Sequence, residues 1–126
     1  MTSFTDKITV LHLHFKFLAA TVDKETQMVH TNAGFQITCT SVGDEIPVSA
    51  TWTFGGTTLV HDQGGFSLTF TADTKKAVLD KSTPASSDDG DYKCDFQFSE
   101  GDGASATSTI TVARKLHYNK IDNSCL

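Results

Sequence analysis

The most constraining feature of this sequence is a set of spaced residues around two cysteines. Cys39 and Cys94 are 55 residues apart, and Trp52, the only tryptophan, lies between them. Cys94 ends the stretch 88–94, Asp-Asp-Gly-Asp-Tyr-Lys-Cys, so Tyr92 precedes it by two residues. From there the hydroxyl of Tyr92 can turn back to the backbone near Asp88 and close the corner that leads into a strand. The pattern fits two strands of facing β-sheets beside one indole.

Alternating apolar and polar side chains predict β-strands along most of the chain. In 8–18, Leu11, Leu13, Phe15 and Phe17 share one face, and 27–30 is predicted to be a second short piece of the same edge. Further strands are predicted at 35–40, 48–54, 57–61, 66–71, 76–81, 91–99 and 104–113. Turn residues separate these segments at the spacing expected for a sandwich. No long helix and no internal repeat is predicted.

The sequence Asp-x-Gly-x-Tyr-x-Cys after an upstream Cys and Trp resembles the immunoglobulin superfamily over roughly residues 15–113. This resemblance implies an all-β, two-sheet Greek-key sandwich with one inter-sheet disulfide, Cys39–Cys94, packed against Trp52. It also makes Leu79, Asp88 and Tyr92 structural residues of the core. The short stretch between Trp52 and Leu79, and a last strand without Phe-Gly-x-Gly, look more like the intermediate or C2-type members than antigen-receptor variable domains.

The chain is predicted to divide into three parts. Residues 1–14 form an N-terminal extension, either extra length of the first strand or a remnant of a signal peptide. Against a signal peptide, His12, His14 and Lys16 interrupt its apolar region, so we expect this segment to belong to the folded protein. Residues 15–113 form the immunoglobulin-like domain, and residues 114–126 form a tail. No run reaches the ~18 apolar residues that cross a bilayer, so no direct membrane insertion is expected.

The composition limits the kinds of molecule that this chain is expected to bind. The net charge is −5, and the basic residues are scattered, so nucleic acid is not an expected partner. If Cys39 and Cys94 pair, Cys125 is left over and either bridges two molecules or lies in an inert tail. A homodimer could form through Cys125, or through the apolar N-terminal strand, for which Ala19–Glu25 could act as the hinge of an exchange.

Catalysis and cofactors are not expected. Neither Gly-x-Ser-x-Gly nor His-Glu-x-x-His occurs, and small sandwiches seldom form a pocket that excludes water, so no catalytic residue is assigned. His12 and His14 share one strand face and are weak candidates for a metal site, because no third ligand is visible. The acids of 88–102 lack the calcium-loop pattern and are interpreted as a solvated acidic face.

The remaining candidate site is a protein-binding surface. In the fold implied by the resemblance, one sheet's outer face and adjoining loops bind other proteins. The candidate partner-binding residues there are Thr53, Thr58, Val60, Asp95, Gln97, Glu100 and Asp102. The resemblance implies an extracellular recognition or adhesion module, of the kind found in immune receptors or secreted immune molecules, that binds a protein or cell-surface ligand. The alternative is an intracellular structural spacer of a giant muscle-type protein, in which the cysteines stay reduced.

Overall fold

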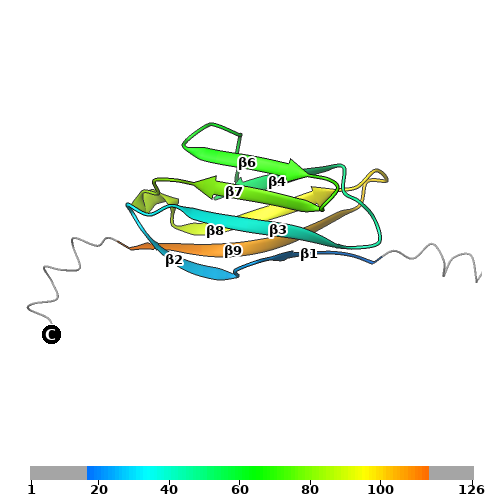
Figure 1. Cartoon of the computed structure of the whole chain (residues 1–126), viewed down its shortest axis with the longest axis horizontal. Coiled ribbons are helices and arrows are strands. Elements are labelled where there is room, and N and C mark those ends of the chain that lie inside the picture. Colours follow the sequence, from blue (N-terminus) through cyan, green and yellow to red (C-terminus); the bar gives the residue numbers. More distant parts are fainter. Residues whose placement is uncertain (1–16, 114–126) are drawn as a thin grey trace, which may run out of the picture.

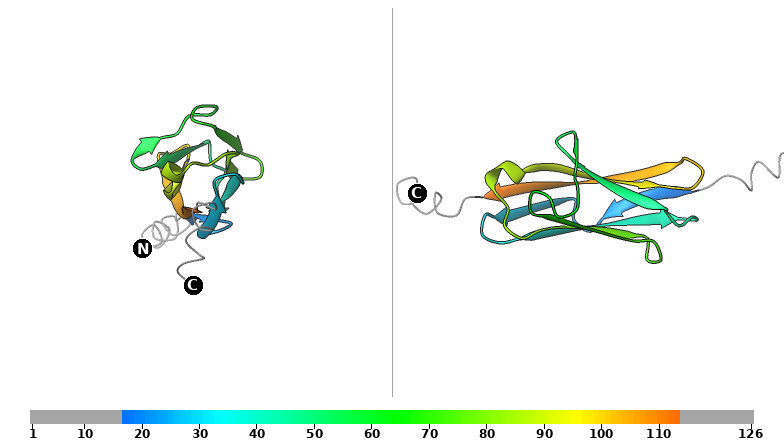
Figure 2. Two further views of the ribbon diagram at one scale, coloured as in Figure 1. Left: turned by 90° about the vertical axis from the view of Figure 1, so that its left-hand side faces the viewer. Right: turned by 90° about the horizontal axis from the view of Figure 1, so that it is seen from above.

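Two β-sheets packed face to face account for residues 17–113, the part of the chain that the computed structural model describes (Figures 1 and 2). Within these residues the only helix is one 3₁₀ turn, Ser86–Asp88 (η1), between two strands. The predicted all-β sandwich is therefore confirmed. The predictions for residues 1–14 and 114–126, including those for His12, His14 and Cys125, lie outside the described residues.

The first sheet has four antiparallel strands. Its strands are β1 (Leu18–Val22), β3 (Phe35–Gly43), β6 (Phe66–Thr71) and β7 (Lys76–Lys81), in the order β1-β3-β7-β6. The bounds of β6 and β7 are those predicted from the sequence. β3 continues to Gly43, three residues further than predicted, and Gly43 has φ 142°. A side chain there would collide with the carbonyl oxygen of Phe17, so glycine lets β1 start beside the end of β3.

The second sheet has five strands. They are β2 (Thr26–His30), β4 (Ser49–Phe54), β5 (Thr57–Thr58), β8 (Gly90–Gln97) and β9 (Gly103–Ala113), in the order β2-β9-β8-β4-β5. β2 runs parallel to β9, and the other neighbours are antiparallel. The prediction of a strand over 57–61 is wrong in length, because only Thr57 and Thr58 pair with β4. Val48, with which the predicted strand 48–54 begins, precedes β4 and is 58% exposed.

The N-terminal strand is divided between the two sheets. Residues 27–30 were expected to continue one edge strand, but β1 pairs with β3 whereas β2 pairs with β9 of the other sheet. Backbone hydrogen bonds fix the crossing, from Asp23 N to Thr38 O (2.9 Å) and from Thr109 N to Glu25 O (2.8 Å). Of the proposed hinge Ala19–Glu25, residues 19–22 lie in β1 and residues 23–25 connect β1 to β2, and exchange through this segment stays a prediction. Figure 1 shows β1 and β2 following one another along this side of the sandwich.

The core lies between the sheets and is built from the inward positions of the alternating strands. Ile37, Leu79, Tyr92 and Phe96 have no exposed surface. Burying an aliphatic or aromatic side chain of this size contributes about 1.5–3 kcal/mol relative to leaving it in water. In β3, β7, β8 and β9 buried positions alternate with more exposed ones, as the prediction of strands from alternating side chains requires.

Candidate functional site

A disulfide joins the two sheets at the centre of the core. Cys39 of β3 and Cys94 of β8 are bonded, with their Cα atoms 6.5 Å apart, which confirms the predicted inter-sheet bridge. Trp52 of β4 is the cross-strand neighbour of Cys94 and is 2% exposed. The indole therefore lies beside the disulfide, as the resemblance implied.

The tyrosine corner predicted at the entry to β8 is confirmed. The Tyr92 hydroxyl donates a hydrogen bond to the backbone oxygen of Asp88 (2.6 Å), and the ring stacks on Phe54 at a centroid distance of 4.3 Å. Burial raises the pKa of the Tyr92 phenol well above its ordinary value, and the negative charges of Asp88 and Asp89 raise it further. Tyr92 is thus a fixed, protonated donor that anchors the corner.

A buried ion pair supports the same corner and was missed from the sequence. The Lys81 ammonium, at the end of β7, lies 3.5 Å from a carboxylate oxygen of Asp88 and 4.3 Å from the centre of the Phe66 ring. It also donates to the carbonyl oxygen of Gly64. Lys81 has the same parity as the inward residues Ala77 and Leu79, and that parity was the signal that could have found it.

The acidic residues near this corner are engaged within the domain. The Asp88 carboxylate also accepts from Ala85 N (2.6 Å), and Asp89 accepts from Val112 N (2.8 Å). Asp91 accepts from the Thr109 hydroxyl (2.6 Å). Among the residues that the structure describes, no three His, Cys, Asp or Glu side chains gather in a metal-binding arrangement. These carboxylates therefore serve the fold, each holding a neighbouring segment.

Strand register brings four of the seven candidate binding residues together on the outer face of the five-stranded sheet. Thr58, Thr53, Lys93 and Thr107 form one row across β5, β4, β8 and β9. The next row is Thr51, Asp95 and Ser105, and Ser49 and Gln97 follow. Thr53, Thr58, Asp95 and Gln97 therefore belong to one strip of polar side chains.

The other three candidates lie away from this strip. Glu100 and Asp102 are exposed in the turn between β8 and β9, which closes through a hydrogen bond from Phe98 N to Asp102 O (3.0 Å). Val60, expected on a strand, lies in the segment 59–65 that leads from β5 to β6, and it is 50% exposed. The expected strand position of Val60 is therefore wrong, because β5 ends at Thr58.

Within the described residues, no helix has the length and apolar character needed to cross a bilayer. No protein-family model matches this chain, and no curated protein sequence matches it either. Its fold, however, is similar to a solved structure described as "Crystal structure of Dscam1 Ig7 domain, isoform 9". The TM-score is 0.62 at 15% sequence identity, and the match covers 75% of this chain and 99% of the other. Residues 17–113 form an immunoglobulin fold.

The outer face of this immunoglobulin-like domain also carries an apolar residue that was not among the candidates. Met28 of β2 is 70% exposed and is paired in register with Thr111 of β9. Its chain neighbour Val29 is buried, so alternation puts Met28 on the outer face. The parity was visible in the sequence, but β2 could be placed at the edge of this sheet only once its pairing with β9 was known.

Proposed function

We propose that this domain is an extracellular recognition or adhesion module that binds a protein or cell-surface ligand through the outer face of its five-stranded sheet. The observation that carries the proposal is the strip of exposed and half-buried hydroxyl, amide and charged side chains over β5, β4, β8 and β9, with the exposed Met28 further along the same face, beside Thr111. Methionine adapts its shape to a partner, and hydroxyls and amides exchange water for partner hydrogen bonds at little cost. The activity proposed is non-covalent binding rather than catalysis.

The polar groups of this strip are held in place by one another. Ser49 donates to the Gln97 side-chain oxygen (2.8 Å), and the Gln97 amide donates to Asp95 O (3.3 Å). The Lys93 ammonium lies 3.8 Å from Asp95, with half of its side chain exposed. An exposed pair at that distance adds little stability, so both charges remain open to a partner.

The disulfide supports the extracellular location. Cytosolic thiols are kept reduced, whereas disulfides persist in secreted proteins and ectodomains. An intracellular spacer would hold Cys39 and Cys94 as free thiols. Counting the thiols of protein isolated from its source under alkylating conditions separates the two readings: two protected cysteines support the extracellular module, and three free thiols contradict it.

A charge-reversal pair tests the binding face. The domain, labelled and tetramerised, is applied to intact cells from the tissue that produces it, and surface staining is measured. Lys93→Glu, at the centre of the strip, is expected to lower staining at least fivefold. Lys76→Glu reverses the charge of an exposed lysine on β7 of the other sheet and is the matched control. Equal staining by both variants, or loss with Lys76→Glu alone, would contradict the proposal.

A further inference from the structure

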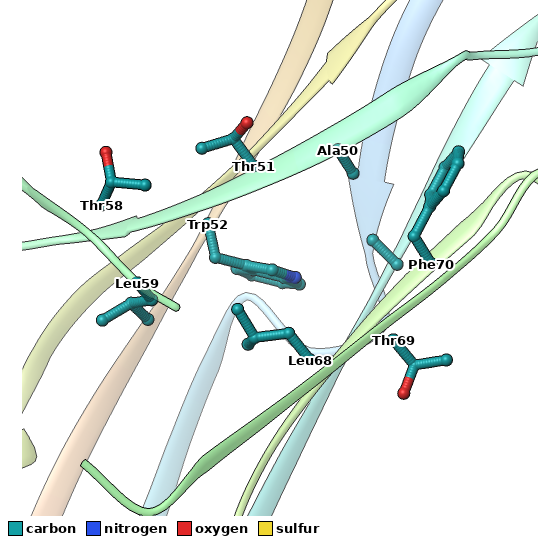
Figure 3. Close-up of a pocket in the computed structure, with 9 residues that line it drawn as sticks. Ala50, Thr51, Trp52, Thr58, Leu59, Leu68, Thr69 and Phe70 are labelled. Carbon is teal, nitrogen blue, oxygen red and sulfur yellow. The ribbon is translucent and has the colours of Figure 1, made fainter. Parts of the chain in front are cut away.

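A cleft opens on the side of the sandwich where the N-terminal strand does not cross. There the sheets end in β5 and β6, which are edge strands of different sheets. Between them lies a cavity of about 260 Å³ (Figure 3). We call this cavity the Trp52 cleft. It is lined by Ala50, Thr51, Trp52, Thr58, Leu59, Leu68, Thr69, Phe70 and Ala77. None of these residues carries a charge, so the cleft favours a neutral occupant.

The side chains that face the cleft are apolar. In Figure 3 Trp52 and Ala50 of β4 point toward Leu68 and Phe70 of β6, into the space between the sheets. Thr51 lies on the opposite side of the β4 ribbon from the indole. The threonines therefore line the cleft without presenting their hydroxyls to its interior.

One polar side-chain atom breaks this apolar lining. The indole nitrogen of Trp52 is buried, and it has no hydrogen-bond acceptor among the described residues. Figure 3 shows this nitrogen at the end of the ring that faces the Ala50 and Phe70 side of the cleft. Buried N–H groups in folded proteins are nearly always paired. An unpaired buried donor beside a cavity marks where an acceptor of a bound molecule would sit once the side chains that cover it move.

The edge of β6 is already covered where a partner strand would need to pair. Leu68 N donates to the His61 imidazole (3.0 Å), and Phe66 O accepts from Asp62 N (2.8 Å). These bonds occupy backbone groups that point away from β7. An added β-strand is therefore disfavoured, and the occupant that fits is a small molecule entering between the sheets.

We propose that the Trp52 cleft binds a small neutral molecule that has one apolar ring or branched chain and one hydrogen-bond acceptor, such as a ketone or ester carbonyl. The acceptor receives the Trp52 N–H, and the apolar part packs against Leu68 and Phe70. Apolar cavities of about 150 Å³ hold benzene, so 260 Å³ accommodates a single ring with a carbonyl substituent. Leu68 and Phe70 are only partly buried on an edge strand, so a change of rotamer admits the acceptor to the covered nitrogen. Thr51 and Thr58 border both this cleft and the polar strip, but the side chains proposed to contact the small molecule, Trp52, Leu68 and Phe70, are not part of the strip.

The unique tryptophan makes the test direct, because the full chain gives one indole N–H signal in a ¹H–¹⁵N spectrum. Acetophenone is titrated against ethylbenzene, which has similar shape and no acceptor. We expect a saturable downfield shift of the Trp52 N–H signal with acetophenone. The dissociation constant of ethylbenzene should be at least about tenfold higher than that of acetophenone. No saturable change with acetophenone would overturn the proposal, and so would equal affinity for both compounds.

A filled-cleft variant locates the site. Ala50→Leu places extra methyl groups in the cleft and should abolish the acetophenone shift, whereas Thr107→Val, on β9 and outside the lining, should preserve it. Unchanged acetophenone affinity in folded Ala50→Leu would overturn the location. If Ala50→Leu does not fold, Leu68→Ala on the edge strand takes its place, and it must change the acetophenone dissociation constant at least threefold for the location to stand.

Discussion

The ammonium of Lys81 lies 3.5 Å from the carboxylate of Asp88, and their side chains are only 10% and 11% exposed. This pair links the end of β7 to η1, and the Lys81 bond to Gly64 brings in the segment that precedes β6. The backbone oxygen of Asp88 receives the Tyr92 hydroxyl, so the ion pair and the tyrosine corner share one residue. The entry to β8 is thereby fixed by two interactions that meet at Asp88.

Breaking the ion pair on one side should cost more than removing it altogether. Lys81→Met keeps an apolar stem against Phe66 but leaves the buried Asp88 charge without its cation, with only the Ala85 N hydrogen bond remaining, and we expect a loss of about 3 kcal/mol in the free energy of unfolding. Lys81→Met combined with Asp88→Asn should lose less than the sum of the two single changes. Urea denaturation of the four proteins measures this coupling, and additive losses would show that the pair contributes no interaction energy.

Tyr92→Phe removes one hydroxyl and leaves the Asp88 carbonyl oxygen without its buried donor. We expect the free energy of unfolding to fall by about 1–2 kcal/mol. Thr107→Val removes an exposed hydroxyl from β9 and should change stability by less than about 0.5 kcal/mol. Equal denaturation midpoints for Tyr92→Phe and Thr107→Val would mean that the corner hydrogen bond adds nothing.

The raised pKa of Tyr92 predicts an alkaline limit to stability. The native phenol holds its proton at a pH where the unfolded phenol, with a pKa near 10, has lost it. The unfolded state then binds fewer protons, so this contribution to stability is full below about pH 10 and declines above it by up to ~1.4 kcal/mol per pH unit.

Absorbance at 295 nm checks this prediction. The chain has two tyrosines, so in Tyr118→Phe the signal comes from Tyr92 alone. We expect no phenolate until the domain unfolds, and a cooperative rise when it does. If the Tyr92 phenol ionised near pH 10 while the domain stayed folded, the raised pKa would be contradicted. Tyr92→Phe should remove this part of the decline.

Loss of the disulfide should be severe. Cys39 and Cys94 are 55 residues apart in the sequence, and for a loop of this length the chain-entropy estimate of stabilisation is about 4 kcal/mol. The double change Cys39→Ala and Cys94→Ala is expected to lower the unfolding free energy by that amount, whereas Cys125→Ser should leave it unchanged. Thermal denaturation with and without reductant is a second measurement. Reduction should lower the midpoint of thermal unfolding only in proteins that retain both core cysteines.

Alternation of apolar and polar residues was sufficient to predict the bounds of the strands that have one buried and one exposed face. β6 and β7 were predicted to the residue because inward apolar positions alternate with polar ones between clear turns. Alternation cannot say which sheet a strand joins, and β2 pairs with β9, which lies some 80 residues away in the sequence. The switch between β1 and β2 was therefore missed, since it depends on tertiary pairing alone.

The candidate site was predictable in part for the same reason. Thr53, Asp95 and Gln97 follow from strand parity, whereas Val60 was misplaced because 59–65 turns toward β6, where Asp62 N bonds to Phe66 O. Lys81 was overlooked because lysine is seldom buried without a partner, and its partner Asp88 becomes visible only when β7 and η1 are packed together. The Trp52 cleft exists because the edge strands β5 and β6 are separated in the folded domain. A local sequence pattern cannot predict that separation.

The parallel pairing of β2 with β9 determines how this domain responds to tension. β1 begins and β9 ends toward opposite ends of the long axis of the sandwich (Figure 1), and β2 and β9 run side by side along it. A force applied at those two ends loads the β1–β3 pairs and pulls β2 and β9 past each other, so the parallel pairs from Thr26–Thr109 to His30–Ala113 are loaded in shear together. We therefore expect the strand that changes sheets to resist extension through its pairs with both sheets.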